Sequence, residues 1–209
     1  MNAARFITLE GIEGAGKSTV AAALRAELER RGCPVLLTRE PGGTPLAERL
    51  RELLLRRGDE IISPTAETLL MFAARAIHLD NAVRPALAAG HWVICDRFSD
   101  ASYAYQGAGR GVATALLDQL AQSVHGECWP DRTLLFDLPV STGLERARSR
   151  AGAPDRFEAE QSEFFERVRN GYLARAAADP LRMRVVDARP AANVVAAAAL
   201  AALADLLPP

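Results

Sequence analysis

The stretch GIEGAGKST, Gly11 to Thr19, follows the apolar run RFITLEG and leads into a helical pattern that begins at Lys17. Its residues satisfy the spacing G-x-x-x-x-G-K-[ST], which marks a phosphate-binding loop when it joins a strand to a helix. Small residues let successive backbone N–H groups face phosphate oxygens, and the helix N-terminus adds its positive dipole. The stretch therefore predicts a nucleotide-binding loop in an α/β fold; a glycine-rich turn without a ligand is the alternative.

An alternation of strand and helix continues along the 209 residues. Five short runs have the near-continuous apolar character of strands covered on both faces: RFITLEG, PVLLTRE, HWVICDR, RTLLFDL and LRMRVVDA. Helical patterns begin near Lys17, Thr44, Pro64, Val112, Ser141 and Phe157, with a last one after Pro190. This alternation predicts a parallel sheet, and because no linker or repeat interrupts it, we expect one domain over residues 1–209. The order of the strands does not follow from the pattern.

The composition excludes several classes of partner. With 25 Lys and Arg against 26 Asp and Glu, the formal charge of −1 predicts no nucleic-acid partner and no membrane surface. Three widely spaced cysteines argue against a disulfide framework and against paired-thiol zinc ligation, so we expect a cytoplasmic protein. No secretory signal is predicted, and the Ala-rich run AANVVAAAALAALADLL is interpreted as a helix packed on the domain rather than a membrane span.

Two segments look like mobile surface loops. The first, QGAGRGV at Gln106 to Val112, is rich in glycine. The second, RARSRAGAPDRFE at Arg146 to Glu158, is basic and is broken by Gly152 and Pro154. A kinase needs a lid that excludes water, and this second segment is the candidate, although a solvated helix end is the alternative.

Residue types near the loop suggest phosphoryl transfer. Lys17 would reach the β- and γ-phosphates of a nucleotide, and the Ser18 hydroxyl would bind Mg²⁺. The strand WVICD ends in Asp96, which in such folds can hold Mg²⁺ through water, although a strand-end cap is equally consistent with Asp96 alone. We find no N-K-x-D motif of a switch GTPase. Three arginines could hold the phosphate of an acceptor: Arg51, Arg75 and Arg97. For Arg51 and Arg75, which fall on helical patterns, a surface or ion-pair position is the alternative.

The chain resembles the bacterial thymidylate kinase family, whose members phosphorylate dTMP with ATP. The resemblance is carried by FITLEGIEGAGKST, TREPGGTPLAERLRELLL, CDRFSDASYAYQGAGRG and DRFE, which follow the family's order. It implies a five-stranded parallel sheet wrapped by helices, a homodimer, and Mg²⁺ as cofactor. Another nucleoside monophosphate or deoxynucleoside kinase is an alternative, and a P-loop ATPase or nucleotide-binding regulator is a remote one.

The resemblance also assigns roles to individual residues. The expected ATP-binding residues are Gly11, Ile12, Glu13, Gly14, Ala15, Gly16, Lys17, Ser18 and Thr19. The expected dTMP-binding residues are Glu13, Glu40, Pro41, Arg51, Phe72, Arg75, Arg97, Ser102, Tyr105 and Gln106. The expected metal-binding residues are Ser18 and Asp96. Among these, Tyr105 is expected beneath the sugar, where it would exclude a 2'-hydroxyl, and Glu13 is expected to accept a hydrogen bond from the acceptor's 3'-hydroxyl or to order lid arginines and magnesium water.

Two departures from the family pattern bear on the site. Relatives commonly have an aromatic residue four positions before Arg75, where this chain has Met71 followed by Phe72; we expect Phe72 to stack on the base, with a core position as the alternative. Some relatives have an arginine at the position of Gly14. The resemblance then implies that the lid supplies this charge, so the expected catalytic residues are Lys17, Arg97, Arg148, Arg150 and Arg156.

Overall fold

The computed structural model describes residues 4–56, 58, 60–149, 156–157 and 160–208. Its centre is a five-stranded sheet of β1 (Phe6–Glu10), β2 (Val35–Arg39), β3 (Trp92–Asp96), β4 (Arg132–Asp137) and β5 (Met183–Asp187). Each predicted strand run is confirmed. All neighbouring strands pair in parallel, in the order β2-β3-β1-β4-β5. The predicted α/β class with a five-stranded parallel sheet is therefore confirmed, and the strand order is added to it.

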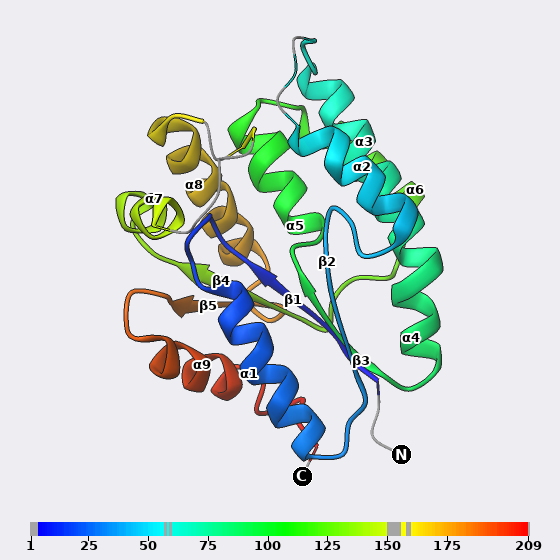
Figure 1. The fold of residues 1–209 in the computed structure, drawn as a ribbon, viewed down its shortest axis with the longest axis vertical. Helices are drawn as coiled ribbons and strands as arrows, with labels where there is room; N and C mark the ends of the chain where they lie inside the picture. Colours follow the sequence, from blue (N-terminus) through cyan, green and yellow to red (C-terminus); the bar gives the residue numbers. More distant parts are fainter. Residues whose placement is uncertain (1–3, 57, 59, 150–155, 158–159, 209) are drawn as a thin grey trace.

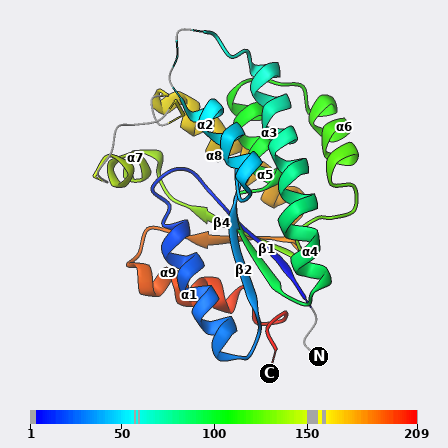
Figure 2. The ribbon, with the colours of Figure 1, turned by 45° about the vertical axis from the view of Figure 1, so that its right-hand side comes forward.

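Helices cover both faces of this sheet, as Figures 1 and 2 show. On one side, α1 (Lys17–Arg30) and α9 (Ala192–Ala201) lie against each other. On the other side, α8 (Ser162–Ala178) crosses β4 and β5 and packs along a helical segment that follows β3. The remaining helices are α2 (Pro45–Leu55), α3 (Pro64–His78), α4 (Arg84–Ala88), α6 (Thr114–Val124) and α7 (Val140–Arg148), with the π-helical turn η1 (Leu79–Val83) between α3 and α4. In the described part of the chain, no helix has the length and apolar character that crossing a membrane requires.

The sequence explains why two of these helices, α2 and α3, begin where they do. The Thr44 and Ser63 side chains accept hydrogen bonds from the first turns of α2 and α3, and each helix has proline at its first position. Two predicted starts are displaced: α6 begins at Thr114 rather than near Val112, and α8 begins at Ser162 rather than near Phe157, which lies in a turn.

β1 is the central strand, and all of its residues are buried. Its register places Leu9 beside Asp96 on β3 and beside Leu134 on β4. The loop that follows β1 therefore emerges between the ends of its two neighbours. Ligands of open parallel sheets bind at this carboxyl edge, so the strand order alone brings Asp96 next to the predicted phosphate-binding loop.

The glycine-rich segment Gln106 to Val112 is not the surface loop that its composition predicts. Short α5 (Ser99–Ser102) runs into the π-helical segment η2 (Tyr103–Gly109), in which Gln106 and Gly109 are buried against α8. A Cβ at Gly109 would come within 2.7 Å of the Phe164 ring. Gly109 therefore serves close helix packing, whereas Gly111, with a φ of 78° and open space at its Cβ position, serves a turn.

Candidate active site

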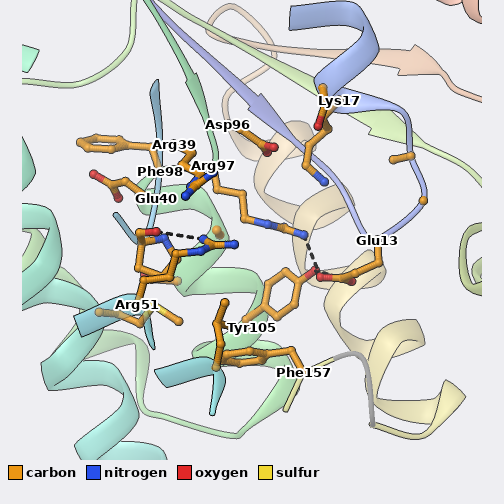
Figure 3. Close-up of a pocket in the computed structure, with 18 of the residues that line it drawn as sticks. Glu13, Lys17, Arg39, Glu40, Arg51, Asp96, Arg97, Phe98, Tyr105 and Phe157 are labelled. Atoms are coloured by element: carbon orange, nitrogen blue, oxygen red, sulfur yellow. Dashed lines mark hydrogen bonds and ion pairs between the residues drawn. The ribbon is translucent and has the colours of Figure 1, made fainter. Parts of the chain in front are cut away.

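A cavity of about 570 Å³ lies at the carboxyl ends of β1, β2 and β3. The phosphate-binding loop forms one wall, and the segments after β2 and β3 form the other (Figure 3). Most of the predicted residues line it: Glu13, Gly14, Ala15, Gly16, Lys17, Ser18, Thr19, Glu40, Pro41, Arg51, Arg75, Asp96, Arg97, Ser102, Tyr105 and Gln106. Residues from distant parts of the sequence thus line one cavity.

The loop has the form of an anion cradle around the ammonium of Lys17. Gly14 and Gly16 have φ angles of 75° and 84°, a backbone region that favours glycine and turns the N–H groups between them inward. Lys17 Nζ donates to the carbonyls of Gly11 and Ile12 at 3.1 and 3.2 Å. Burial lowers the pKa of Lys17 to about 8, and neighbouring Arg97 adds to the effect. A phosphate bound in the loop would oppose this lowering of the pKa, because its oxygens would accept hydrogen bonds from the charged ammonium.

The carboxylate of Glu13 faces the opposite wall of the cavity rather than the cradle. It accepts from Arg97 Nη2 at 2.8 Å and from the Tyr105 hydroxyl at 2.8 and 2.9 Å (Figure 3). The Arg97 guanidinium lies 4.7 Å from the centre of the Tyr105 ring. Burial raises the pKa of Tyr105 well above its usual value, although Arg97 opposes the shift, so the hydroxyl remains a donor. Glu13 therefore joins the loop to the segment that follows β3.

A second polar group surrounds Arg75 on α3. Arg75 Nε donates to Glu40 Oε2 at 2.7 Å, and Nη2 donates to Ser102 Oγ at 3.1 Å. The other oxygen of Glu40 contacts His78 Nδ1 at 3.0 Å, and His78 Nε2 is 2.7 Å from Thr38 Oγ1. The remaining nitrogen, Arg75 Nη1, is buried and finds no hydrogen-bond partner among the described residues. Because Arg75 lines the cavity, this nitrogen is suited to a ligand oxygen.

Asp96 and Ser18 fit a magnesium site of the usual nucleotide-dependent kind. Both line the cavity beside Lys17, and buried Asp96 Oδ1 has no hydrogen-bond partner in the described part of the chain. No group of three or more His, Cys, Asp or Glu side chains within the described residues is arranged to hold a metal. Mg²⁺ commonly takes one or two carboxylates and completes its shell with water and substrate phosphates, so this sparse donor set is compatible with it.

Comparisons with known proteins identify the family. The thymidylate kinase family model matches residues 9–198. The chain is 59% identical over 192 residues to a thymidylate kinase of Pseudomonas savastanoi pv. phaseolicola, covering 91% of each chain, and 53% identical over 205 residues to one of Alkalilimnicola ehrlichii, covering 98% and 94%. The chain belongs to the thymidylate kinase family. A crystal structure of thymidylate kinase from Ehrlichia chaffeensis superposes with a TM-score of 0.79 at 32% identity, over 96% of this chain and 98% of that one.

The sequence prediction of a kinase of the thymidylate kinase family is therefore confirmed. Among the described residues that were expected in the cavity, four side chains lie elsewhere: Ile12, Phe72, Arg148 and Arg156. Gly11 and Ile12 contribute backbone carbonyls to Lys17. Arg150 lies outside the described residues, as does most of the lid segment between Arg146 and Glu158.

Phe72 does not occupy the place expected for a stacking residue. It is 1% exposed and packs with Tyr103, Leu117 and Ala121. Its ring lies 4.6 Å from the Arg75 guanidinium, on the side of the core. Met71 lines the cavity instead. Successive helical residues point about 100° apart, and the packing of α3 against η2 and α6 turns the Phe72 side inward.

Arg156 is engaged at a buried carboxylate outside the cavity. Its Nη2 lies 2.7 Å from Glu67 Oε2, and its Nε donates to the carbonyl of Leu54 at 2.8 Å. The other oxygen of Glu67 accepts from Gln106 Nε2 at 2.8 Å. Arg148 is exposed at the end of α7. Glu67 therefore links the end of the lid segment to Gln106, which is one of the expected dTMP-binding residues.

Gly14 has a steric reason to lack a side chain. A Cβ at Gly14 would lie 2.0 Å from the carbonyl oxygen of Gly143 on α7, and a Cβ at Gly143 would lie 2.6 Å from the carbonyl oxygen of Glu13. The loop and α7 thus meet backbone to backbone. This contact excludes the arginine that some thymidylate kinases have here, as long as the loop keeps its conformation.

Some cavity residues were missed or undervalued by the sequence analysis. Arg39, Leu55, Met71, Phe98, Ala101, Arg146 and Phe157 also line the wall. The position of Arg39 at the end of a strand was a usable signal, because strand ends form the site. His78, to which the sequence assigns no role, is fully buried against Glu40, and no local pattern could have indicated this pairing.

Proposed function

We propose that the cavity transfers the γ-phosphoryl group of ATP to dTMP, giving ADP and dTDP, and that Glu13 and Arg97 separate its donor side from its acceptor side. The observation that carries the proposal is the direction of Glu13. Its carboxylate leaves the cradle and pairs with Arg97 and Tyr105. A single loop thus offers backbone N–H groups to one substrate and a carboxylate to the other.

On the donor side, the loop residues Gly11 to Thr19 would hold the ATP phosphates. Lys17 would leave the carbonyls it now contacts and bridge the β- and γ-phosphates. Ser18 and, through water, Asp96 would hold Mg²⁺. When bound, the ion neutralises charge on the phosphate oxygens and orients them for transfer.

On the acceptor side, the free Nη1 of Arg75 would donate to a carbonyl oxygen of thymine, with Ser102 and Gln106 nearby. Met71 provides an apolar surface beside Arg75 in place of Phe72. Tyr105 would lie beneath the sugar and leave no room for a 2'-hydroxyl. Along the cleft, Glu40, Pro41 and Arg51 would complete the wall, since Arg51 Nη1 already donates to the Pro41 carbonyl at 2.9 Å.

The chemistry requires positioning and positive charge more than acid or base catalysis. A phosphate oxygen of dTMP is already anionic near neutral pH, so it can attack the γ-phosphorus in line without a strong general base. Lys17 and Arg97, which both line the cavity, would supply the positive charge. From the lid, Arg148 and Arg150 would supply further charge to the transferred group. Arg156 would anchor the lid through Glu67 and act on the reaction from there.

We also propose that the chain is one cytoplasmic domain that forms a homodimer. The thiols of Cys95 and Cys128, which form no disulfide among the described residues, suit a reducing compartment. Leu46 and Leu53 are about half-exposed two turns apart on α2, and α3, which packs against α2, has half-exposed Leu69. These exposed apolar side chains would suit contact with a second copy. Sedimentation should show a dimer for the wild type and a monomer for the variant that combines Leu46→Glu with Leu53→Glu; a wild-type monomer would refute the assembly.

A coupled assay of ATP-dependent phosphorylation over a nucleotide panel tests the substrate assignment. We expect turnover of dTMP to exceed that of dUMP, dCMP and thymidine clearly. Preference for dCMP or thymidine would favour another small-molecule kinase. ATP consumption that does not depend on any acceptor would favour an ATPase. Glu13→Gln should raise KM for dTMP more than KM for ATP, and the reverse would refute the division of the loop between two substrates.

A further inference from the structure

The backbone of Arg97 has an unusual conformation that several contacts hold in place. Its φ angle is 70°, in the left-handed region that residues other than glycine rarely adopt. Its N–H donates to the carbonyl of Leu9 at 3.0 Å, and its carbonyl accepts from the Cys95 thiol at 3.0 Å. The next amide, of Phe98, donates to Glu10 Oε1 at 2.7 Å. Such conformations persist where the surroundings determine them, and they concentrate at functional sites.

The guanidinium of Arg97 is connected to the same carboxyl group, that of Glu10, through a second set of hydrogen bonds. Arg97 Nη1 donates to the Tyr172 hydroxyl at 3.1 Å, and that hydroxyl donates to Glu10 Oε2 at 2.6 Å. The hydrogen bonds therefore form a closed path from the Arg97 side chain through Tyr172 and Glu10 to the amide of Phe98. One oxygen of Glu10 helps to fix the turn of the backbone, and the other acts on the side chain through Tyr172. The same guanidinium also donates to the Gly11 carbonyl at 2.9 Å and to Glu13 Oε1 at 2.8 Å.

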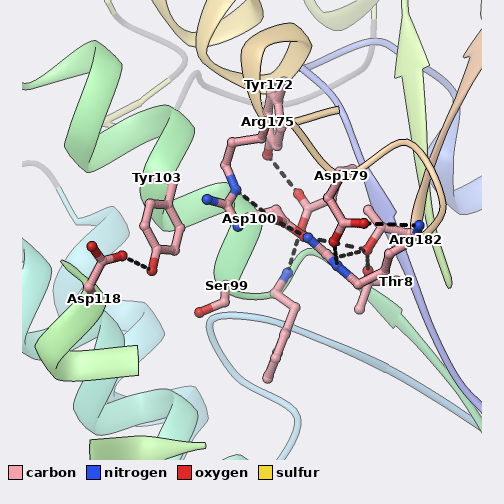
Figure 4. Close-up of polar contacts among 12 residues, drawn as sticks. Thr8, Ser99, Asp100, Tyr103, Asp118, Tyr172, Arg175, Asp179 and Arg182 are labelled. Atoms are coloured by element: carbon pink, nitrogen blue, oxygen red, sulfur yellow. Dashed lines mark hydrogen bonds and ion pairs between the residues drawn. The ribbon is translucent and has the colours of Figure 1, made fainter. Parts of the chain in front are cut away.

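Tyr172 is itself fixed by the polar cluster shown in Figure 4. One turn along α8, Arg175 Nε donates to Asp100 Oδ1 at 2.6 Å, and its guanidinium lies 3.8 Å from the centre of the Tyr103 ring. Arg182 Nη1 donates to Asp100 Oδ2 at 2.7 Å. Burial by itself would raise the pKa of Asp100, but these arginines hold it below its usual value. Because Asp100 is on α5, the cluster fastens α8 to the segment that begins with Arg97.

Glu10 occupies a place where a carboxyl group is costly. It is fully buried at the end of the central strand, and burial, together with nearby Asp100, raises its pKa to about 7. Burying an acid destabilises a fold unless its hydrogen bonds compensate. Glu10 does not line the cavity, so we assign its role to the hydrogen bonds that it accepts from the Phe98 amide and the Tyr172 hydroxyl.

We infer that Glu10, acting through Tyr172 and the Phe98 amide, is a positioning residue that aims Arg97 at the acceptor phosphate. The inference rests on the proposed function of Arg97. Neither Glu10 nor Tyr172 touches a substrate in this scheme. Their loss changes how often Arg97 is correctly placed, and it leaves the donor cradle intact.

Tyr172→Phe is the primary test, because it removes one hydroxyl from a ring whose packing remains. Loss of a hydrogen bond to a charged group typically changes an equilibrium by about ten- to a hundredfold. We expect kcat/KM for dTMP to fall by about tenfold or more, while KM for ATP stays within about twofold of the wild type. Glu10→Gln retains an acceptor for the Phe98 amide and should keep more activity than Glu10→Ala. Tyr172→Phe keeps the inference testable if Glu10→Ala does not fold.

Asp137→Asn is the matched control. Asp137 also ends a strand of the sheet and also pairs with α8, through Arg169 Nε at 2.7 Å, but it has no contact with Arg97. We expect it to leave the kinetic constants unchanged. If Tyr172→Phe and Asp137→Asn have the same small effect on kcat/KM, the positioning role is refuted.

Arg97→Ala separates this inference from the proposed function. If Tyr172 acts through Arg97, adding Tyr172→Phe to Arg97→Ala should cause no further loss in kcat/KM for dTMP. A loss that adds in full overturns the inference and leaves the proposed function standing. If Arg97→Ala alone leaves turnover of dTMP unchanged, both the proposed role of Arg97 and the inference built on it are wrong.

Discussion

Replacement of Gly14 by alanine should destabilise the protein through a single backbone contact. Any L-residue at its φ of 75° costs about 1 kcal/mol. The new Cβ would also lie 2.0 Å from the carbonyl oxygen of Gly143, so the loop and α7 must separate. Overpacking of this kind costs about 1–3 kcal/mol. We therefore expect Gly14→Ala to lose about 2–4 kcal/mol of unfolding free energy in total.

Gly32 provides the control for the conformational part. Its φ is also 75°, and no described atom lies within 4 Å of the position of its Cβ. Gly32→Ala should lose only about 1 kcal/mol, which corresponds to about 2–4 °C in Tm for a chain of this size. Urea unfolding of both variants and of the wild type measures the difference. Equal losses for the two variants would refute the steric account of Gly14, and a larger loss for Gly14→Ala, with weaker ATP binding, would support it.

Met71→Ala should raise KM for dTMP several-fold with little loss of stability, whereas Phe72→Ala should cost about 3–5 kcal/mol of unfolding free energy. Denaturation and steady-state kinetics of both variants measure these effects. The opposite pattern would restore Phe72 as the stacking residue. Arg156→Ala should leave the buried Glu67 carboxylate with fewer partners. The variant should lose about 3–5 kcal/mol of unfolding free energy or show increased proteolysis near the lid. An unchanged protease pattern together with unchanged stability would contradict the anchoring role. His125 should make stability dependent on pH: burial, reinforced by Arg75, lowers its pKa to about 4 from 6.5, so the unfolded chain takes up the proton first as the pH falls. Stability should drop by about 2 kcal/mol between pH 7 and pH 5, and urea unfolding of His125→Gln should lack this part of the drop.

The fold was largely predictable because its signals are local. Each strand of a covered parallel sheet is a short apolar run, and α2 and α3 each begin with a capping side chain and a proline. The segment Gln106 to Val112 was wrongly predicted as a loop, because glycine favours both turns and close helix packing. The packing of Gly109 against Phe164 and Val168, more than fifty residues later, decides between these two structures.

The site was predictable to the extent that its residues follow strand ends. Lys17, Asp96 and Arg97 follow this rule, since parallel strands bring their carboxyl ends together. The contacts that orient them were not predictable. Tyr172 and Glu10 are separated by 162 residues, and nothing in the sequence near either one indicates the other. The choice between Met71 and Phe72 likewise depends on how α3 is rotated against its neighbours, which is a property of tertiary packing.

The ion pair between Arg97 and Glu13 has a consequence for inhibitors. This ion pair connects the end of β3 to the loop after β1. A ligand that binds Arg97 or Glu13 therefore changes the free energy with which the other side chain can bind a second ligand. By thermodynamic linkage, ATP must alter the affinity for dTMP by the same factor by which dTMP alters the affinity for ATP. A compound that mimics dTMP and binds Glu13 therefore distinguishes the nucleotide-free protein from the ATP-bound one. Series of such compounds should rank differently when they are measured with and without ATP.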